Sequence, residues 1–196
     1  MDARARLESL EPIFRSRDAV AAGISWRDLY AMRDAGEILQ LSRGLYQRAD
    51  SAGTGDLDFV TVCRRAPHGT ICLDSALAYW DLTDDIPAQV HLAVAKGNHR
   101  PRIDYPPTRV HIFQAEMFEL GRVQIRAEAG AEFAITDRER TLADAFRSRR
   151  LVSEEAALHA LRRYLSARPD RARLAEVARS LRAWPALREV MRVMEA

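Results

Sequence analysis

Two glycines divide the first fifty residues into segments that are too short to fold alone. Gly23 stands between two stretches with helical spacing, and Gly36 separates the second of these from a run that alternates apolar and polar residues. Glycine ends a helix in the left-handed conformation without steric cost. Ser25 and Asp28 form a capping pattern before the second stretch. The spacing therefore predicts a helix, a tight turn and a capped helix, as in a helix-turn-helix.

The helix boundaries follow from the spacing of apolar residues and from capping residues. A first amphipathic helix is expected around Leu7, Leu10, Ile13 and Phe14, which repeat at three- and four-residue intervals. The next two helices are expected over Arg17–Ala22, capped by Ser16, and from Ser25 to Ala35.

The alternating segment after Gly36 turns at Ser42-Arg43-Gly44 and then alternates again, which is typical of a β-hairpin. A hairpin this short is marginal in water and must pack against the third helix. The pattern predicts a winged helix, whose third helix enters the major groove and whose wing contacts the neighbouring backbone or minor groove. We expect DNA contacts from Trp26, Arg27, Tyr30 and Arg33 on the helix and from Gln40, Ser42, Arg43 and Arg48 on the wing, with Arg43 pointing toward DNA from its tip.

An alternative is a winged helix that contacts protein rather than DNA. Residues 1–50 carry eight arginines and eight acidic residues, so this segment has no net positive charge. Winged helices are reused for both purposes, and the fold alone does not choose between them.

Four segments in order resemble the AbiEi-type antitoxins of type IV toxin-antitoxin systems. They are the stretch FRSRDAVAAGISWRDLYAMRDAGEILQLSRGLYQ, then GTICLDSALAYWDL, QVHLAVAKGNHRP and ITDRERTLADAF, and together they cover roughly residues 10–148. The resemblance implies an amino-terminal winged helix that represses the antitoxin-toxin operon. It also implies a larger domain that counteracts a nucleotidyltransferase-like toxin, directly or indirectly.

The chain after residue 48 predicts a second domain. Residues 49–56 are small and polar and are expected to form a linker. Helices are expected over Leu57–Arg65 and Leu73–Leu82, the latter capped by Asp74 or Ser75. The expected strands, which alternate or are β-branched, are Val90–Ala95, Arg109–Phe113, Val123–Glu128 and Glu132–Ile135.

The family signature RTLxD matches Arg140, Thr141, Leu142 and Asp144. It follows a capping pattern, Thr136 to Glu139, at the start of a helix expected to reach Arg147. Arg140 and Asp144 are four residues apart and are expected to pair on one helix face. We interpret this segment, and Ser75, as structural, because capping and pairing account for its residues.

Basic residues collect in two places in the second domain. Residues 137–196 hold fourteen arginines against nine acids and are expected to form helices, three of them after Ser153. Solvated helix faces often carry such charges. The candidates for contact with an acidic toxin surface are Lys96, His99, Arg100 and Arg102 in one loop, and Arg162, Arg163, Arg171 and Arg173 on the later helices.

Catalysis and metal binding lack a sequence signature. Lys96 is the only lysine, and no acidic residue stands two positions before it, as a metal-dependent nuclease strand requires. Cys63 and Cys72 have no second pair at zinc spacing. No signal-peptide pattern or membrane span is present, so we expect a cytoplasmic protein with both cysteines reduced.

We therefore predict an α+β, DNA-binding antitoxin without enzymatic activity, cofactor or metal. A winged helix-turn-helix at residues 1–48 precedes a mixed antitoxin domain at 57–196, helical from about 137. Its expected partners are an inverted-repeat operator and the toxin, with no membrane. The alternatives are a protein-interaction module, a regulator without antitoxin activity, and a nuclease-related protein.

Overall fold

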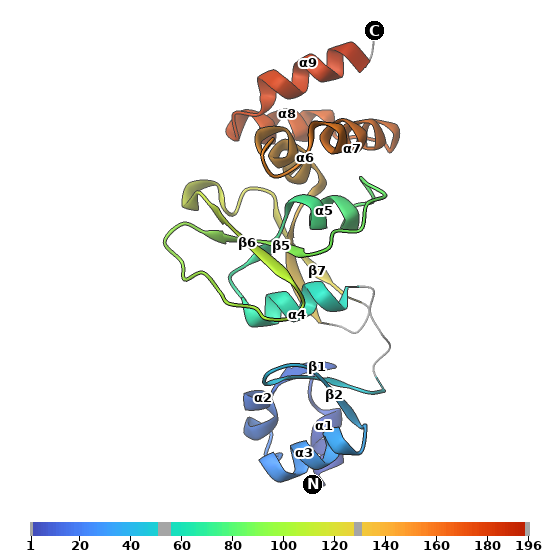
Figure 1. Ribbon diagram of the computed structural model, residues 1–196, viewed down its shortest axis with the longest axis vertical. Helices are drawn as coiled ribbons and strands as arrows, with labels where there is room; N and C mark the ends of the chain where they lie inside the picture. Colours follow the sequence, from blue (N-terminus) through green and yellow to red (C-terminus); the bar gives the residue numbers. More distant parts are fainter. Residues whose placement is uncertain (1, 51–55, 128–130, 195–196) are drawn as a thin grey trace.

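The computed structural model describes residues 2–50, 56–127 and 131–194, so most of the expected linker lies outside the described residues. The chain is mixed α+β, and its elements form three successive layers along the long axis (Figure 1). We call residues 2–50 the amino-terminal unit, residues 56–136 the sheet unit, and the rest the carboxy-terminal helices. None of the described helices has the length and apolar character needed to cross a membrane.

The amino-terminal unit has the element order of a winged helix. Its three strands form an antiparallel sheet in the order β1-β3-β2. The elements are α1 (Ala3–Glu8), β1 (Ile13–Arg15), α2 (Ser16–Ala21), α3 (Trp26–Asp34), β2 (Ile38–Ser42) and β3 (Leu45–Arg48).

The expectation that Ile13 and Phe14 continue the first helix is wrong. They lie in β1, where Phe14 pairs with Tyr46 of β3 and stacks on its ring at 6.0 Å between centroids. Pro12 separates this strand from α1 and disfavours helical backbone in the residue before it. Ser16 does not cap α2 from outside but is its first residue, and the Asp18 carboxylate accepts the Arg15 N–H at 2.9 Å.

The sheet unit holds a five-stranded sheet in the order β6-β5-β4-β8-β7. The β5–β6 and β4–β8 pairs are parallel, and the others are antiparallel. Its elements are α4 (Leu57–Arg65), β4 (Thr70–Ile71), α5 (Leu73–Tyr79), β5 (Val90–Ala95), β6 (Thr108–Phe113), the 3-10 turn η1 (Ala115–Met117), β7 (Arg122–Arg126) and β8 (Glu132–Thr136).

Helices cover both faces of this sheet (Figure 1). Val60 and Val62 of α4 pack against Leu92 and Ile135 on one face, while α5 packs with the carboxy-terminal helices on the other. Strand β4, absent from the prediction, is only two residues long. The helix expected over Leu73–Leu82 ends at Tyr79 instead. Neither Asp74 nor Ser75 caps it, because Cys72 occupies the N-cap position.

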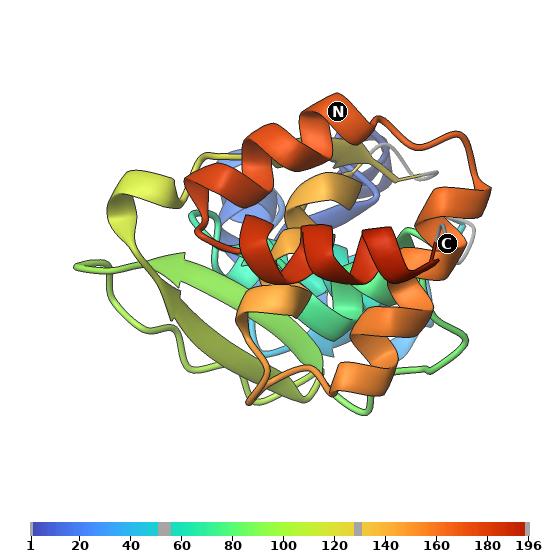
Figure 2. The same ribbon diagram turned by 90° about the horizontal axis from the view of Figure 1, so that it is seen from above.

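Four helices follow within the described residues up to 194; seen from above, α9 crosses over α6, and α7 and α8 lie on either side of it (Figure 2). They are α6 (Arg138–Arg147), α7 (Glu154–Ser166), α8 (Arg171–Ser180) and α9 (Trp184–Met194). The expected capping of α6 comes from the Asp137 side chain, which accepts the Arg140 N–H at 2.6 Å, rather than from Thr136. Ser153 caps α7 in the same way through the Ala156 N–H at 3.1 Å.

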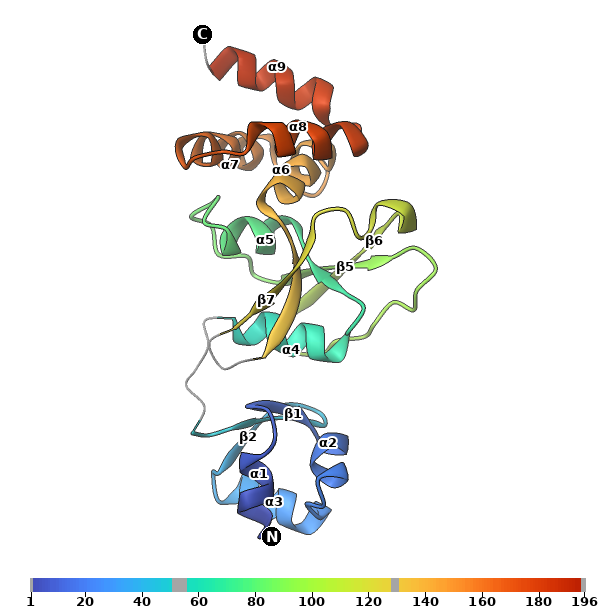
Figure 3. The same ribbon diagram turned by 180° about the vertical axis from the view of Figure 1, so that it is seen from behind.

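The outer face of the amino-terminal sheet packs against the sheet unit, with α4 lying next to it (Figure 3). Ile13 and Leu45 are fully buried in one apolar cluster with Val60 and Phe133. An ion pair between Glu11 and Arg64 crosses the same boundary. The three helices of the amino-terminal unit therefore lie on the side away from the sheet unit.

Candidate nucleic-acid interface

Helix α3 has one buried face and one exposed face. The residue at which the helix begins determines which side chains lie on each face. Ser25 accepts the Asp28 N–H on its Oγ at 3.1 Å and so fixes where the helix begins. Leu29 and Met32 then point into the core of the amino-terminal unit. The residues between them are left on the outside.

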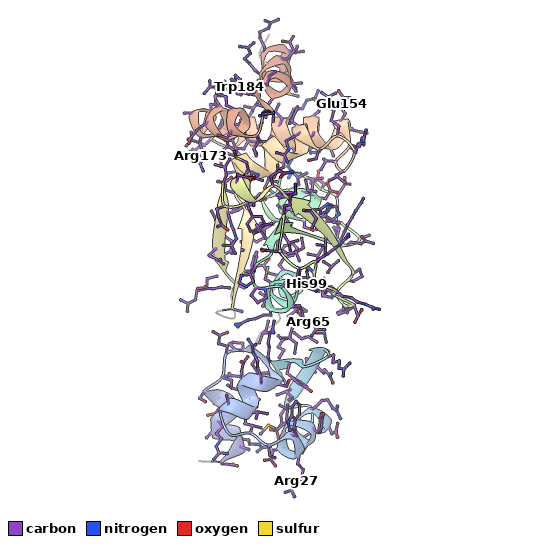
Figure 4. All side chains as sticks on the ribbon, turned by 90° about the vertical axis from the view of Figure 1, so that its left-hand side faces the viewer. Arg27, Arg65, His99, Glu154, Arg173 and Trp184 are labelled. Carbon is purple, nitrogen blue, oxygen red and sulfur yellow. The ribbon has the colours of Figure 1, made fainter. Side chains whose placement is uncertain are left out.

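The exposed face of α3 carries two aromatic rings and an arginine. Trp26 is 50% exposed and Tyr30 44% exposed, and their ring centroids lie 6.0 Å apart. Arg27 is exposed and has no ion-pair partner among the described residues. Figure 4 places Arg27 at the extreme end of the molecule, far from the sheet unit. This face is therefore open to a partner as large as a DNA duplex.

Arg33 lies on the same helix but is partly engaged. Its guanidinium stands over the Tyr30 ring, 5.0 Å from the centroid, and donates to the Asp34 carboxylate at 2.8 Å. Its charge is thus partly balanced within the helix.

The hairpin residues do not join this face. Arg43 is exposed, but its backbone carbonyl accepts a hydrogen bond from Arg65 Nη1 of α4 at 2.8 Å. Figure 4 shows Arg65 at the boundary of the sheet unit, at the opposite end of the amino-terminal unit from Arg27. The structure therefore does not bring the wing tip together with the α3 residues.

Of the other three wing candidates, Gln40 and Arg48 make local contacts, and Ser42 does not present its hydroxyl to solvent. Gln40 is exposed, with its Nε2 3.4 Å from the Ser42 carbonyl oxygen, and the Ser42 hydroxyl is buried. Arg48 pairs with Asp50 at 2.9 Å and donates to the Glu8 carbonyl at 3.1 Å, so it ties β3 to the end of α1.

The basic loop after β5 is open to solvent. Lys96, His99, Arg100 and Arg102 are all exposed. Arg100 donates to the Val110 carbonyl at 3.2 Å, and Arg102 lies 3.4 Å from an Asp104 carboxylate oxygen. The contact with the backbone therefore restrains Arg100, and the nearby acid restrains Arg102.

The arginines of the carboxy-terminal helices do not form one uniform surface. Arg163 pairs with Asp81 and Asp84 in the loop after α5. Arg173 pairs with Glu176 at 3.2 Å and with Asp137 at 3.7 Å. Arg162 and Arg171 are exposed. Figure 4 shows Arg173 and Glu154 on opposite sides of this layer.

The RTLxD residues lock α6 to the sheet unit, and the expected pair is present. Arg140 Nε lies 2.7 Å from Asp144 Oδ2, with both side chains 1% exposed. Arg140 Nη1 also donates to the Met117 and Leu120 carbonyls at 2.6 and 2.7 Å. Leu142 is fully buried, and the Thr141 hydroxyl lies 2.7 Å from that of Thr136.

Two groups of residues were missed by sequence reasoning. Arg65 was not assigned a role, although it contacts the hairpin. His91 and His111 were predicted on separate strands, but the parallel pairing of β5 and β6 places their rings 5.0 Å apart. Ser75 belongs to this region, because its Oγ accepts the His91 N–H at 2.8 Å.

The cysteines and acids do not form a metal site within residues 2–50, 56–127 and 131–194, where no group of three potential ligands lies together. Cys63 and Cys72 are free and buried. Burial raises the pKa of the Cys63 thiol to about 12, so this group stays a thiol near neutral pH.

Comparison with known proteins supports the resemblance noted in the sequence. Residues 3–49 match the family model described as a transcriptional regulator, AbiEi antitoxin. The crystal structure of the RV2827C protein from Mycobacterium tuberculosis is similar in fold, with a TM-score of 0.57 at 14% identity over 96% of this chain and 79% of that chain. No curated protein matches the chain. The family match covers only the amino-terminal unit, and the resemblance of the segments after residue 49 stays a prediction.

Proposed function

We propose that this protein is a type IV antitoxin that binds operator DNA through the exposed face of α3. In this proposal it represses its own toxin-antitoxin operon in the cytoplasm and counteracts a nucleotidyltransferase-like toxin. The observation that carries the proposal is the open face of α3, within the segment that matches the regulator family.

The α3 side chains suit different parts of a DNA groove. Arg27, which has no acidic partner among the described residues, can donate to a guanine edge or to a phosphate. Trp26 and Tyr30 offer apolar ring surface for a thymine methyl group or a sugar. One winged helix contacts few base pairs, so a selective site needs two copies on an inverted repeat.

A second function, protein recognition by the same helix, is favoured by its aromatic rings. Trp and Tyr are enriched at protein interfaces, and both side chains are about half exposed here. Residues 1–50 also hold equal numbers of arginines and acids, so they lack the excess positive charge that is typical of DNA-binding surfaces. In that case α3 would contact the toxin itself, and operator binding would be absent.

A reporter fused to the promoter of the protein's own operon separates the two functions. We expect the wild type to repress the reporter and the Arg27→Ala variant to lose repression while it still rescues growth under expression of the neighbouring toxin. Arg188→Ala, an exposed arginine on α9, is the matched control and should keep both activities. Absence of repression by the wild type, together with loss of rescue in Arg27→Ala, would favour protein recognition by α3.

The domain division at residues 48 and 57 is part of the same proposal. The apolar contact of Ile13 and Leu45 with Val60 means that removal of the amino-terminal unit would expose buried surface. Full-length variants therefore test the division of labour better than a fragment does.

A further inference from the structure

A pocket of about 530 Å³ lies in the sheet unit, between α5, the start of α7 and the first residues of β5 and β6. Its polar lining includes Asp74, Asp85, His91, Arg109 and Ser153. His91 and Arg109 are register partners on the parallel strands. This pocket is separate from the α3 face, and neither DNA binding nor the RTLxD contacts use it.

His91 is held firmly at the wall of this pocket. Its side chain is only 9% exposed, and its Nδ1 is buried without a hydrogen-bond partner. Asp74 Oδ2 lies 3.7 Å from Nδ1, too far for a hydrogen bond. Buried polar atoms in folded proteins almost always have a partner. A polar group of a ligand could therefore lie next to both His91 Nδ1 and Asp74 Oδ2.

A hydrogen-bond donor fits this position. Burial lowers the pKa of His91, so the neutral ring has one nitrogen that accepts a hydrogen bond. The Asp74 carboxylate accepts only, and burial raises its pKa because the charged form is poorly solvated. An ammonium group has three donors and a positive charge, so it would satisfy both atoms and offset the cost of burying the carboxylate.

The charged residues that line the pocket favour a ligand with one positively charged and one negatively charged group. Asp74 and Asp85 are acidic, while Arg109 is the one basic side chain among the lining residues. This surplus of negative charge disfavours a purely anionic ligand such as inorganic phosphate. Arg109 nevertheless offers a site for one carboxylate, and the amino terminus of the thirteen-residue helix α7 adds partial positive charge at Ser153.

We propose that this pocket binds a free α-amino acid, with its ammonium group between Asp74 and His91 and its carboxylate on Arg109. The ligand would join α5 and β5 to α7, and so stabilise the contact of the sheet unit with the carboxy-terminal helices. Because it binds only the folded chain, it raises the unfolding temperature with concentration.

Thermal unfolding of the full-length protein with each common L-amino acid tests this proposal. We expect at least one to raise the unfolding temperature in a saturable way and to shift the imidazole NMR signals of His91. Its N-acetyl derivative lacks the ammonium group, and the matching amine lacks the carboxylate. Each should bind at least about tenfold more weakly, since hydrogen bonds to charged groups are worth about 1.5–3 kcal/mol.

Substitutions in the pocket test which residue binds the ammonium group and which binds the carboxylate. Asp74→Asn should weaken binding by about tenfold or more, and Arg109→Ala should weaken binding of the amino acid but not of the amine. Asp104→Asn, an exposed acid outside the pocket, is the control. If Asp74→Asn does not fold, Arg109→Ala carries the test, because that side chain is exposed. No response to any L-amino acid, equal binding of the N-acetyl form, or unchanged affinity in the pocket variants would overturn the proposal.

Discussion

Arg65 donates a hydrogen bond from Nη1 to the backbone carbonyl of Arg43 across 2.8 Å, and so joins α4 to the tip of the hairpin. The Glu11–Arg64 ion pair lies at the same boundary. Arg27 stands at the other end of the amino-terminal unit (Figure 4). The open α3 residues and Arg43 at the hairpin tip therefore lie at opposite ends of the amino-terminal unit.

Arg65→Ala should loosen the hairpin without changing operator affinity. The lost hydrogen bond is worth about 0.5–1.5 kcal/mol, so amide hydrogen exchange at Gly44 and Leu45 should be about three- to tenfold faster. Arg100→Ala is the matched control, because it removes a similar guanidinium-to-carbonyl bond, to Val110, in the sheet unit. Unchanged exchange at the hairpin in Arg65→Ala would show that α4 does not hold it.

Asp144→Ala should lower the free energy of unfolding by about 3–5 kcal/mol, because it leaves the buried Arg140 guanidinium without its acid. Urea unfolding measures this change. The double variant Arg140→Met with Asp144→Leu, which removes both charges, should lose less free energy of unfolding than the single variants Arg140→Met and Asp144→Leu lose in sum. A loss below about 1 kcal/mol in Asp144→Ala would contradict the structural role of the pair.

His111 should make the protein less stable as the pH falls from about 6.5 to about 4. Burial, and next the neighbouring His91, lowers its pKa from 6.5 to about 4. In this window the unfolded chain binds a proton that the folded chain does not, so the free energy of unfolding rises with pH. His111→Phe should flatten this part of the curve, whereas His99→Gln, on the exposed loop, should not. Parallel curves for wild type and His111→Phe would contradict the assignment.

Charge reversal at Arg162 and Arg171 should weaken toxin antagonism if the carboxy-terminal helices contact an acidic toxin surface. Both side chains are exposed, so the variant should keep its fold by circular dichroism. Arg163→Glu would break the pairs with Asp81 and Asp84, so it also tests the contact of α7 with the loop after α5. Full rescue of growth by the folded double variant would exclude this face and direct attention to the loop from Lys96 to Arg102.

Local signals in the sequence predicted most of the helices and long strands. Ser25, Asp137 and Ser153 each accept a backbone N–H at the start of a helix, a contact that depends on residues three positions apart. Strand β1 was missed because Ile13 and Phe14 also fit helical spacing, and only pairing with β3 identifies them as a strand. Strand β4 is too short for any periodicity to appear.

The candidate site was predictable only where it depends on residues that are close together in the sequence. Leu29 and Met32 point inward, and this alone places Trp26, Arg27 and Tyr30 on the outer face of α3. The contact of Arg65 with the hairpin joins residues far apart in the chain, and no local pattern reports it. The approach of His91 to Asp74 likewise depends on how α5 packs on β5.

The central claim is that α3 reads operator DNA through Arg27. Affinities of the wild type, Arg27→Ala and Arg188→Ala for promoter DNA and a scrambled duplex, measured at several salt concentrations, test it most directly. We predict that the wild type prefers the promoter, and that Arg27→Ala loses about 1–3 kcal/mol on the promoter but little on the scrambled duplex. Arg188→Ala should match the wild type. Equal wild-type affinity for both duplexes, or an Arg27→Ala variant with unchanged promoter affinity, would contradict the claim.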